Sequence, residues 1–110
     1  MANFLFKKSF QLKTFKPIIY DDLWGKRGVF STIRIIGKKP KYILFDNHLK
    51  KINLALKKLN INFFLSEEKL LSIMPLSNKI KKYDHLLRVA LNSKLISISL
   101  RKRLEPVKNF

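Results

Sequence analysis

Hydrophobic and polar residues alternate over several stretches of the chain, which is the spacing of β-strands. Near the start, alternating phenylalanine and leucine residues predict two short strands within residues 3–15, broken near Lys7-Lys8-Ser9. Residues 29–36 are β-branched and aromatic and predict a longer strand. A turn at Gly37-Lys38-Lys39-Pro40 is then expected to return residues 41–45 as the hairpin partner of that strand.

The second half of the chain contains another predicted hairpin. Residues 85–92 and 95–104 have strand composition and flank a turn at Asn92-Ser93-Lys94. Residues 16–28, which follow the first strands, are expected to form a loop, and residues 75–84 a basic linker.

Two stretches between these strands have helical spacing instead. The first has leucine and isoleucine on one face and lysines mostly on the other, at Leu49, Ile52, Leu56 and Leu59 against Lys50, Lys57 and Lys58. Asp46 or Asn47 is expected to cap the start of this helix. A shorter helix is predicted from Ser66, with two glutamates in its first turn, towards Pro75.

These elements predict an α+β fold, in which one amphipathic helix and one shorter helix pack on an antiparallel sheet of about five or six strands. A length of 110 residues fits a single domain over residues 1–110. No apolar run reaches the length of about 18 residues that a membrane span needs. The chain also lacks cysteine, which fits a cytoplasmic protein.

The usual signatures of catalysis are missing from the sequence. Without cysteine there are no thiolate ligands or thiol nucleophiles, and His48 and His85 are too isolated to predict a metal site. Gly25-Lys26-Arg27-Gly28 lacks the spacing of a phosphate-binding loop and precedes a strand. Asp21-Asp22 is interpreted as a loop cap or surface pair. The residues alone therefore predict no catalytic residue and no metal.

The strongest compositional feature is a formal net charge of +17. A positive excess of this size is typical of proteins that bind nucleic acid or other anions. Most of the charge comes from lysine beside abundant isoleucine and asparagine, so a general compositional bias is the preferred interpretation and a nucleic-acid footprint is the alternative. Both interpretations stay open on the sequence.

One constellation of residues points to a known family. Gly28-Val29-Phe30-Ser31-Thr32-Ile33-Arg34 is followed by Gly37-Lys38, a strand, and then His48-Leu49-Lys50-Lys51-Ile52 at the start of a helix. This order resembles the class IV (fold-type IV) aminotransferases, pyridoxal-phosphate enzymes that include branched-chain and D-amino-acid aminotransferases and aminodeoxychorismate lyases. Their motif is Gly-(Val/Cys)-Phe-Glu-Thr-(Ile/Ala)-Arg, then Gly-Lys, a strand and His-(Leu/Ile)-x-Arg-Leu. The later segment 86–91 is similar to a strand that closes the family's N-terminal small domain.

The chain departs from the family pattern at several positions. Lys51 stands where the family has the arginine that holds the cofactor phosphate, and Ser31 stands where it has an acidic residue. The usual Gly-Asp-Gly is Lys26-Arg27-Gly28, and the late Arg-Gly is replaced by Asn92-Ser93-Lys94. A lysine at position 51 can still offer positive charge to a phosphate, although without the planar fork of arginine.

The resemblance implies specific roles for three residues. Lys51 would contact the phosphate of pyridoxal phosphate, while Phe30 would wall the substrate pocket and Arg88 would receive a substrate carboxylate. The family's Schiff-base lysine belongs to a second domain, and no lysine of this chain matches its context. The chain is therefore expected to be a truncated or split N-terminal domain, inactive alone. It is expected to associate with itself or with a partner polypeptide through an open apolar face.

Two other hypotheses remain from the sequence. The chain could be a small basic protein that binds nucleic acid or the ribosome, because its charges are interleaved with aromatic residues; strong salt dependence of RNA or DNA binding would favour this class. It could also be a gene fragment without a biochemical role. Arg34 alternates with Ile33 and Ile35 and is expected to face outward from its strand.

Overall fold

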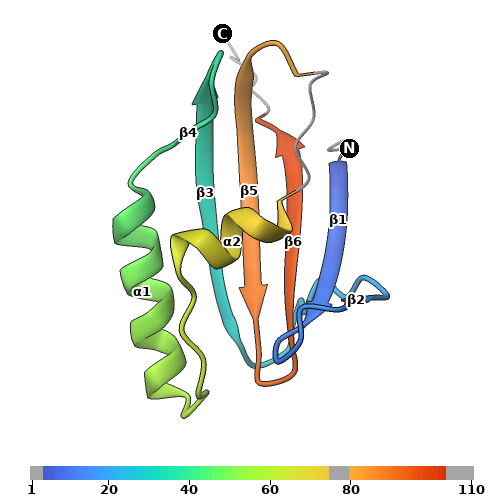
Figure 1. Cartoon of the computed structure of the whole chain (residues 1–110), viewed down its shortest axis with the longest axis vertical. Coiled ribbons are helices and arrows are strands. Elements are labelled where there is room, and N and C mark those ends of the chain that lie inside the picture. Colours follow the sequence, from blue (N-terminus) through green and yellow to red (C-terminus); the bar gives the residue numbers. More distant parts are fainter. Residues whose placement is uncertain (1–3, 75–79, 104–110) are drawn as a thin grey trace, which may run out of the picture.

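Six strands pair into one antiparallel sheet in the order β2-β1-β6-β5-β3-β4, and two helices accompany it (Figure 1). The computed structural model describes residues 4–74 and 80–103. The strands are β1 Phe4–Gln11, β2 Pro17–Ile18, β3 Val29–Gly37, β4 Lys41–Tyr42, β5 Tyr83–Leu91 and β6 Leu95–Lys102. The helices are α1 Phe45–Lys58 and α2 Glu67–Ile73. The predicted α+β fold, with its five or six strands and its long and short helix, is confirmed.

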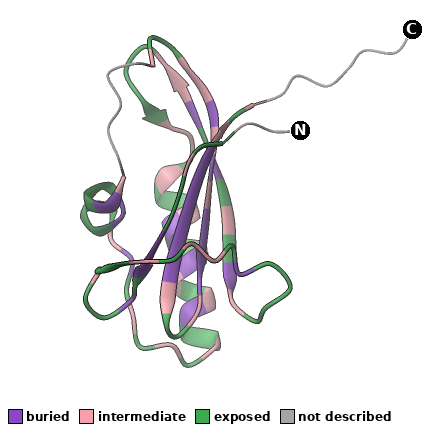
Figure 2. Ribbon diagram, turned by 90° about the vertical axis from the view of Figure 1, so that its right-hand side faces the viewer, coloured by how far each residue is buried: buried purple, intermediate pink, exposed green. Residues whose placement is uncertain are grey.

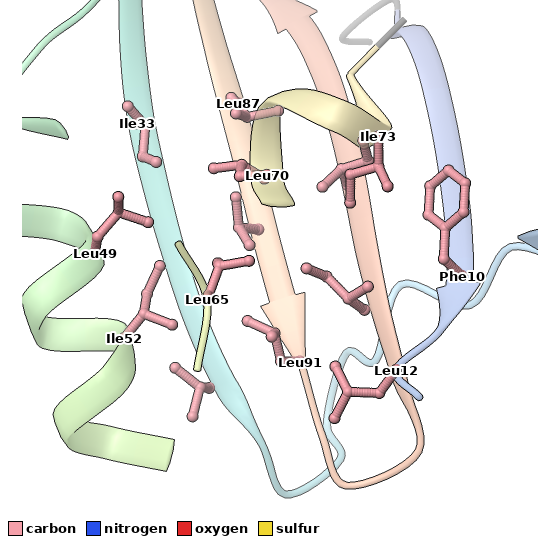
Figure 3. Packing of buried hydrophobic residues seen from close by; sticks show 14 of the residues in the cluster. Phe10, Leu12, Ile33, Leu49, Ile52, Leu65, Leu70, Ile73, Leu87 and Leu91 are labelled. Carbon is pink, nitrogen blue, oxygen red and sulfur yellow. The ribbon is translucent and has the colours of Figure 1, made fainter. Parts of the chain in front are cut away.

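The core lies between one face of the sheet and the two helices. Alternate residues of β5 and β6 are buried and paired in register, such as Leu87 with Leu100 and Val89 with Ile98. Leu49 of α1 and Leu70 of α2 belong to the same buried cluster, and Figure 3 shows both helices directing side chains towards the sheet. Figure 2 shows the same pattern, because the buried parts of the coils face the strands and the outward parts are exposed.

The first strand differs from the prediction. A single strand, β1, replaces the two short strands that were expected within residues 3–15. Lys7, Lys8 and Ser9 do not break it, because each pairs in register with a residue of β6. The irregularity in the pairing lies earlier, between Phe4 and Phe6. Backbone pairing with a long neighbouring strand therefore overrides the polar run in the sequence.

The start of α1 also differs from the prediction, whereas the start of α2 is confirmed. The helix begins at Phe45, after Leu44 in the left-handed conformation, so neither Asp46 nor Asn47 is its cap. The Phe45 ring stacks on Tyr42 of β4 with centroids 4.9 Å apart, which fixes an earlier entry into the helix. In α2 the Ser66 side chain accepts a hydrogen bond from the Lys69 backbone N–H at 3.1 Å, as an N-cap does.

Most of the remaining elements lie within a few residues of their predicted bounds, but β2 lies in the segment predicted as a loop, residues 16–28, and β4 covers only the first two of residues 41–45. The helical face of Leu49, Ile52 and Leu56 is buried, and Leu59 is half-buried at the helix end. Residues 75–79 of the linker predicted at 75–84 lie outside the described residues, and Tyr83 and Asp84 belong to β5. No helix in the described part of the chain is long and apolar enough to cross a membrane.

His85 gives the fold a predicted dependence on pH. Burial lowers the pKa of His85, although neighbouring Asp84 acts in the opposite direction and Lys102 adds to the lowering. Its Nδ1 accepts the Asp84 backbone N–H at 3.0 Å, which needs the neutral ring. Because the unfolded chain binds a proton more readily, this stability is complete above about pH 6.5 and is lost as the pH falls below it.

We expect the free energy of unfolding to fall between pH 7.5 and pH 5 by a smaller amount in His85→Phe than in the original protein. Urea denaturation at the two pH values measures this difference, and phenylalanine retains an aromatic ring beside Tyr83. An unchanged difference would show that His85 titrates normally in the folded chain.

Candidate ligand-binding site on the uncovered sheet face

The sheet face opposite α1 and α2, called the uncovered face below, carries three rows of side chains. The registers of β1, β6, β5 and β3 align residues across these four strands. The rows are Ser9, Ser97, Ala90 and Phe30; Lys7, Ser99, Arg88 and Thr32; and Phe4, Arg101, Leu86 and Arg34. Since side chains alternate along strands, these rows point away from the buried cluster. The face is polar, cationic and aromatic, and not the plainly apolar surface expected from the sequence.

A loop, residues 19–28, is fastened over the first of these rows. The hydroxyls of Ser9 and Ser97 lie 2.6 Å apart and hydrogen-bond to the backbone of Asp21, whose N–H donates to Ser9 Oγ at 2.9 Å. Leu23 of this loop is buried. The Lys26 ammonium lies 2.6 Å from the Asp21 carboxylate, and this contact, with the Leu23 backbone N–H, holds the pKa of Asp21 below its ordinary value. The sheet and the loop thus form one unit at the site.

Arg88 lies in the middle row, and the fastened loop determines its orientation. Its Nη1 donates to the Asp22 carbonyl oxygen at 2.6 Å. Its guanidinium carbon is 5.1 Å from the centre of the Phe30 ring and 5.9 Å from that of Trp24, within the range of cation–π attraction. The Nη2 atom is buried and finds no hydrogen-bond partner among the described residues. A buried donor without a partner is costly, so an anion that reached this atom through a small side-chain movement would be bound favourably.

A groove of about 290 Å³ opens beside this arginine. It is lined by Phe4, Lys7, Tyr20, Asp22, Trp24, Thr32, Leu86, Arg88, Ser99 and Arg101. The Lys7 ammonium lies 4.3 Å from the centre of the Phe4 ring and 6.0 Å from that of Tyr20. Three cationic side chains and one carboxylate among aromatic rings give the groove the chemistry of a small-anion site.

Lys51 lies on α1, whose apolar face packs on the other side of the sheet, so it is not grouped with Phe30 and Arg88. Its position on the helix is nevertheless specific. His48 is one turn earlier on the same side of α1, and its Nδ1 is hydrogen-bonded to Ser31 Oγ of β3 at 2.9 Å. Lys51 therefore lies on the same flank of the helix as His48, with its side chain exposed. Lys50, about 100° away around the helix, lies on the other flank, where it lines a different groove between α1 and residues 61–67.

The free edge of β3 lies next to this side of α1. Strand β4 pairs only with Ile35 and Ile36, so the earlier residues of β3 have no strand partner on that edge. Lys51 is exposed, and the ion pairs of the described residues do not include it.

Gly28, which opens the family-like motif, is required by a close approach. A Cβ added at this position would lie 2.5 Å from the Leu91 carbonyl oxygen, at the end of β5. That contact is impossible without a backbone shift, so only glycine fits here. The need for glycine here is steric.

The groove is lined by three further residues that were not predicted as site residues, Trp24, Lys7 and Arg101. The polar alternation of β6 through Ser97, Ser99 and Arg101 was a usable signal for a solvated sheet face. Trp24 had no such signal, because the folded loop alone brings it to Arg88. Among the described residues there is no group of three or more histidine, aspartate or glutamate side chains able to hold a metal ion.

A scan against known protein families, a search of curated proteins and a search of solved structures each gave no match to this chain.

Proposed function

We propose that this chain forms the substrate-binding wall of a class IV aminotransferase-like enzyme that depends on pyridoxal phosphate. It acts together with a domain or polypeptide that carries the Schiff-base lysine, and it supplies no catalytic residue itself. The observation that carries the proposal is the Arg88 guanidinium, held between Phe30 and Trp24 with one donor unpaired beside a groove. The hydrogen bond between Ser31 and His48, which joins the two halves of the motif, also supports it.

Each residue then has a distinct task. Arg88 binds the carboxylate of an amino acid or 2-oxo acid, Phe30 packs against the rest of the substrate, and Lys51 neutralises the cofactor phosphate. Pyridoxal phosphate, when bound, supplies the electron sink for amino-group transfer or for a lyase reaction. The absence of cysteine is compatible with work in the reducing cytoplasm.

A second candidate function, binding of single-stranded nucleic acid, is favoured by a specific feature of the same face. Trp24 is 79% exposed, and Phe4 and Phe30 are also exposed on this face beside basic residues. Bases stack on such rings while cations follow the phosphates. The small-anion proposal is preferred because the Arg88 guanidinium lies near the Phe30 and Trp24 rings beside a groove of about 290 Å³, a volume that suits one small ligand.

Trp24 is the single tryptophan of the chain and lines the groove, so its fluorescence reports directly on binding. We expect hexanoate to change its emission in a saturable manner, and Arg88→Ala to weaken hexanoate binding about tenfold, as for loss of one charge-assisted hydrogen bond. Arg34→Ala is the matched control. Arg34 lies on the same face but is paired with Asp84 at 3.5 Å, outside the groove.

Equal losses in the Arg88 and Arg34 variants would show that only general positive charge attracts the carboxylate. A short single-stranded RNA forms the second arm of the experiment. If RNA changes Trp24 emission at micromolar concentration, with affinity falling steeply as salt rises, and hexanoate has no effect, the nucleic-acid candidate replaces the enzyme proposal.

A further inference from the structure

The groove beside Arg88 has a second cationic end, formed by Lys7 and Arg101. Both residues line it, and both lie on the uncovered face through the registers of β1 and β6. We propose that Lys7 and Arg101 form a second anion subsite, so that the preferred ligand is a dicarboxylate. This inference rests on the proposed function for the first carboxylate, which Arg88 binds.

The spacing of the two ends follows from the sheet. Lys7 and Arg88 both pair in register with Ser99, so β6 alone separates them. Two strand spacings place their backbones about 10 Å apart. Ser99, a small and buried residue, lies between them in the lining of the groove. A carbon chain with a carboxylate at each end is therefore the shape that meets both cations at once.

The charges at the second end are not neutralised by the protein. Of the described residues, only Lys26 with Asp21 and Arg34 with Asp84 form ion pairs. The carboxylate that lines the groove is that of Asp22, and its Oδ1 accepts the Trp24 backbone N–H at 2.8 Å. Lys7 is instead held above the Phe4 ring. An anion bound at this end would be attracted by both Lys7 and Arg101.

Two aromatic rings also limit where the second carboxylate can lie. Phe4 and Tyr20 flank the Lys7 ammonium, whereas Trp24 and Phe30 flank the Arg88 guanidinium. The rings place apolar surface beside both cations, where the carbon chain of a ligand can pack. The groove thus has a cationic group at each end, which suits a dicarboxylate better than a monocarboxylate of equal length.

The test compares adipate with hexanoate on the full chain, because the two acids have six carbons each and differ by one carboxylate. We expect adipate to bind about tenfold more tightly than hexanoate in moderate salt, as measured by Trp24 fluorescence. Lys7→Ala is expected to remove most of this advantage, because it weakens adipate binding much more than hexanoate binding. Arg101→Ala should act in the same direction.

Lys8→Ala is the matched control, since Lys8 is the next residue of β1 and pairs with Ile98 of the opposite sheet face. It should leave the adipate advantage intact. If hexanoate binds through Arg88 but adipate has no advantage, the second subsite is wrong while the proposed function stands. If Lys7 and Lys8 variants behave alike, the advantage reflects net charge and the subsite is overturned. If neither acid binds, both the subsite and the Arg88 site are overturned.

Discussion

Replacement of Leu87 by alanine is expected to lower the free energy of unfolding by about 3–4 kcal/mol, the largest single effect expected for this chain. Leu87 is 0% exposed on the central strand β5, in register with Ile33 on one side and Leu100 on the other. Figure 3 shows it close to Leu70 of α2. The truncation leaves a cavity where sheet and helix meet, and the neighbouring strands cannot close it because their backbones are paired.

Urea denaturation of the full chain measures this change, and Leu54→Ala is the matched control. Leu54 is also a leucine, but it lies on the outer side of α1 and is 60% exposed. Its replacement should change the free energy of unfolding by no more than about 0.5 kcal/mol. A similar loss in both variants would mean that α2 does not cover the sheet as described.

The fold was predictable wherever a local pattern and the tertiary environment agree. The hairpin of β5 and β6 followed from alternation alone, and α2 followed from Ser66 and the glutamates after it. The first strand was misjudged because Lys7, Lys8 and Ser9 are locally polar, yet β6 supplies pairing to each of them. A sequence pattern does not contain that neighbour.

The start of α1 was misjudged for a similar reason. Asp46 and Asn47 are good capping residues, but the left-handed Leu44 and the stacking of Phe45 on Tyr42 set the helix start earlier. The stacking contact with Tyr42 of β4 therefore decides where α1 begins. Such a contact depends on how the short hairpin closes, and local propensity does not determine it.

The candidate site was less predictable than the fold. Phe30 and Arg88 entered through a family resemblance, and their mutual contact is a consequence of the register between β3 and β5. Lys7 and Arg88 are more than eighty positions apart in the sequence and share a groove only because both flank Ser99. No local spacing could have joined them.

The last expected result concerns the cofactor end of the proposed site. In the complex with the lysine-bearing domain, Lys51→Ala should weaken retention of pyridoxal phosphate about tenfold, because one charged contact to the phosphate is lost. Lys51→Arg should retain or improve it, since a guanidinium offers two parallel hydrogen bonds to phosphate. Equilibrium dialysis of the complex against decreasing cofactor concentrations measures both changes.

Lys50→Ala is the internal control for this result. The hydrogen bond between His48 and Ser31 fixes the orientation of α1 against β3. Lys51 lies on the same flank of the helix as His48, whereas Lys50 lies on the other flank, beside residues 61–67. Both lysines are exposed and carry the same charge, so general electrostatic attraction affects them equally. Retention that falls only in the Lys51 variant assigns the phosphate contact to one side of the helix. Equal behaviour of the two variants would make both ordinary surface lysines and would remove the support that α1 gives to the family resemblance.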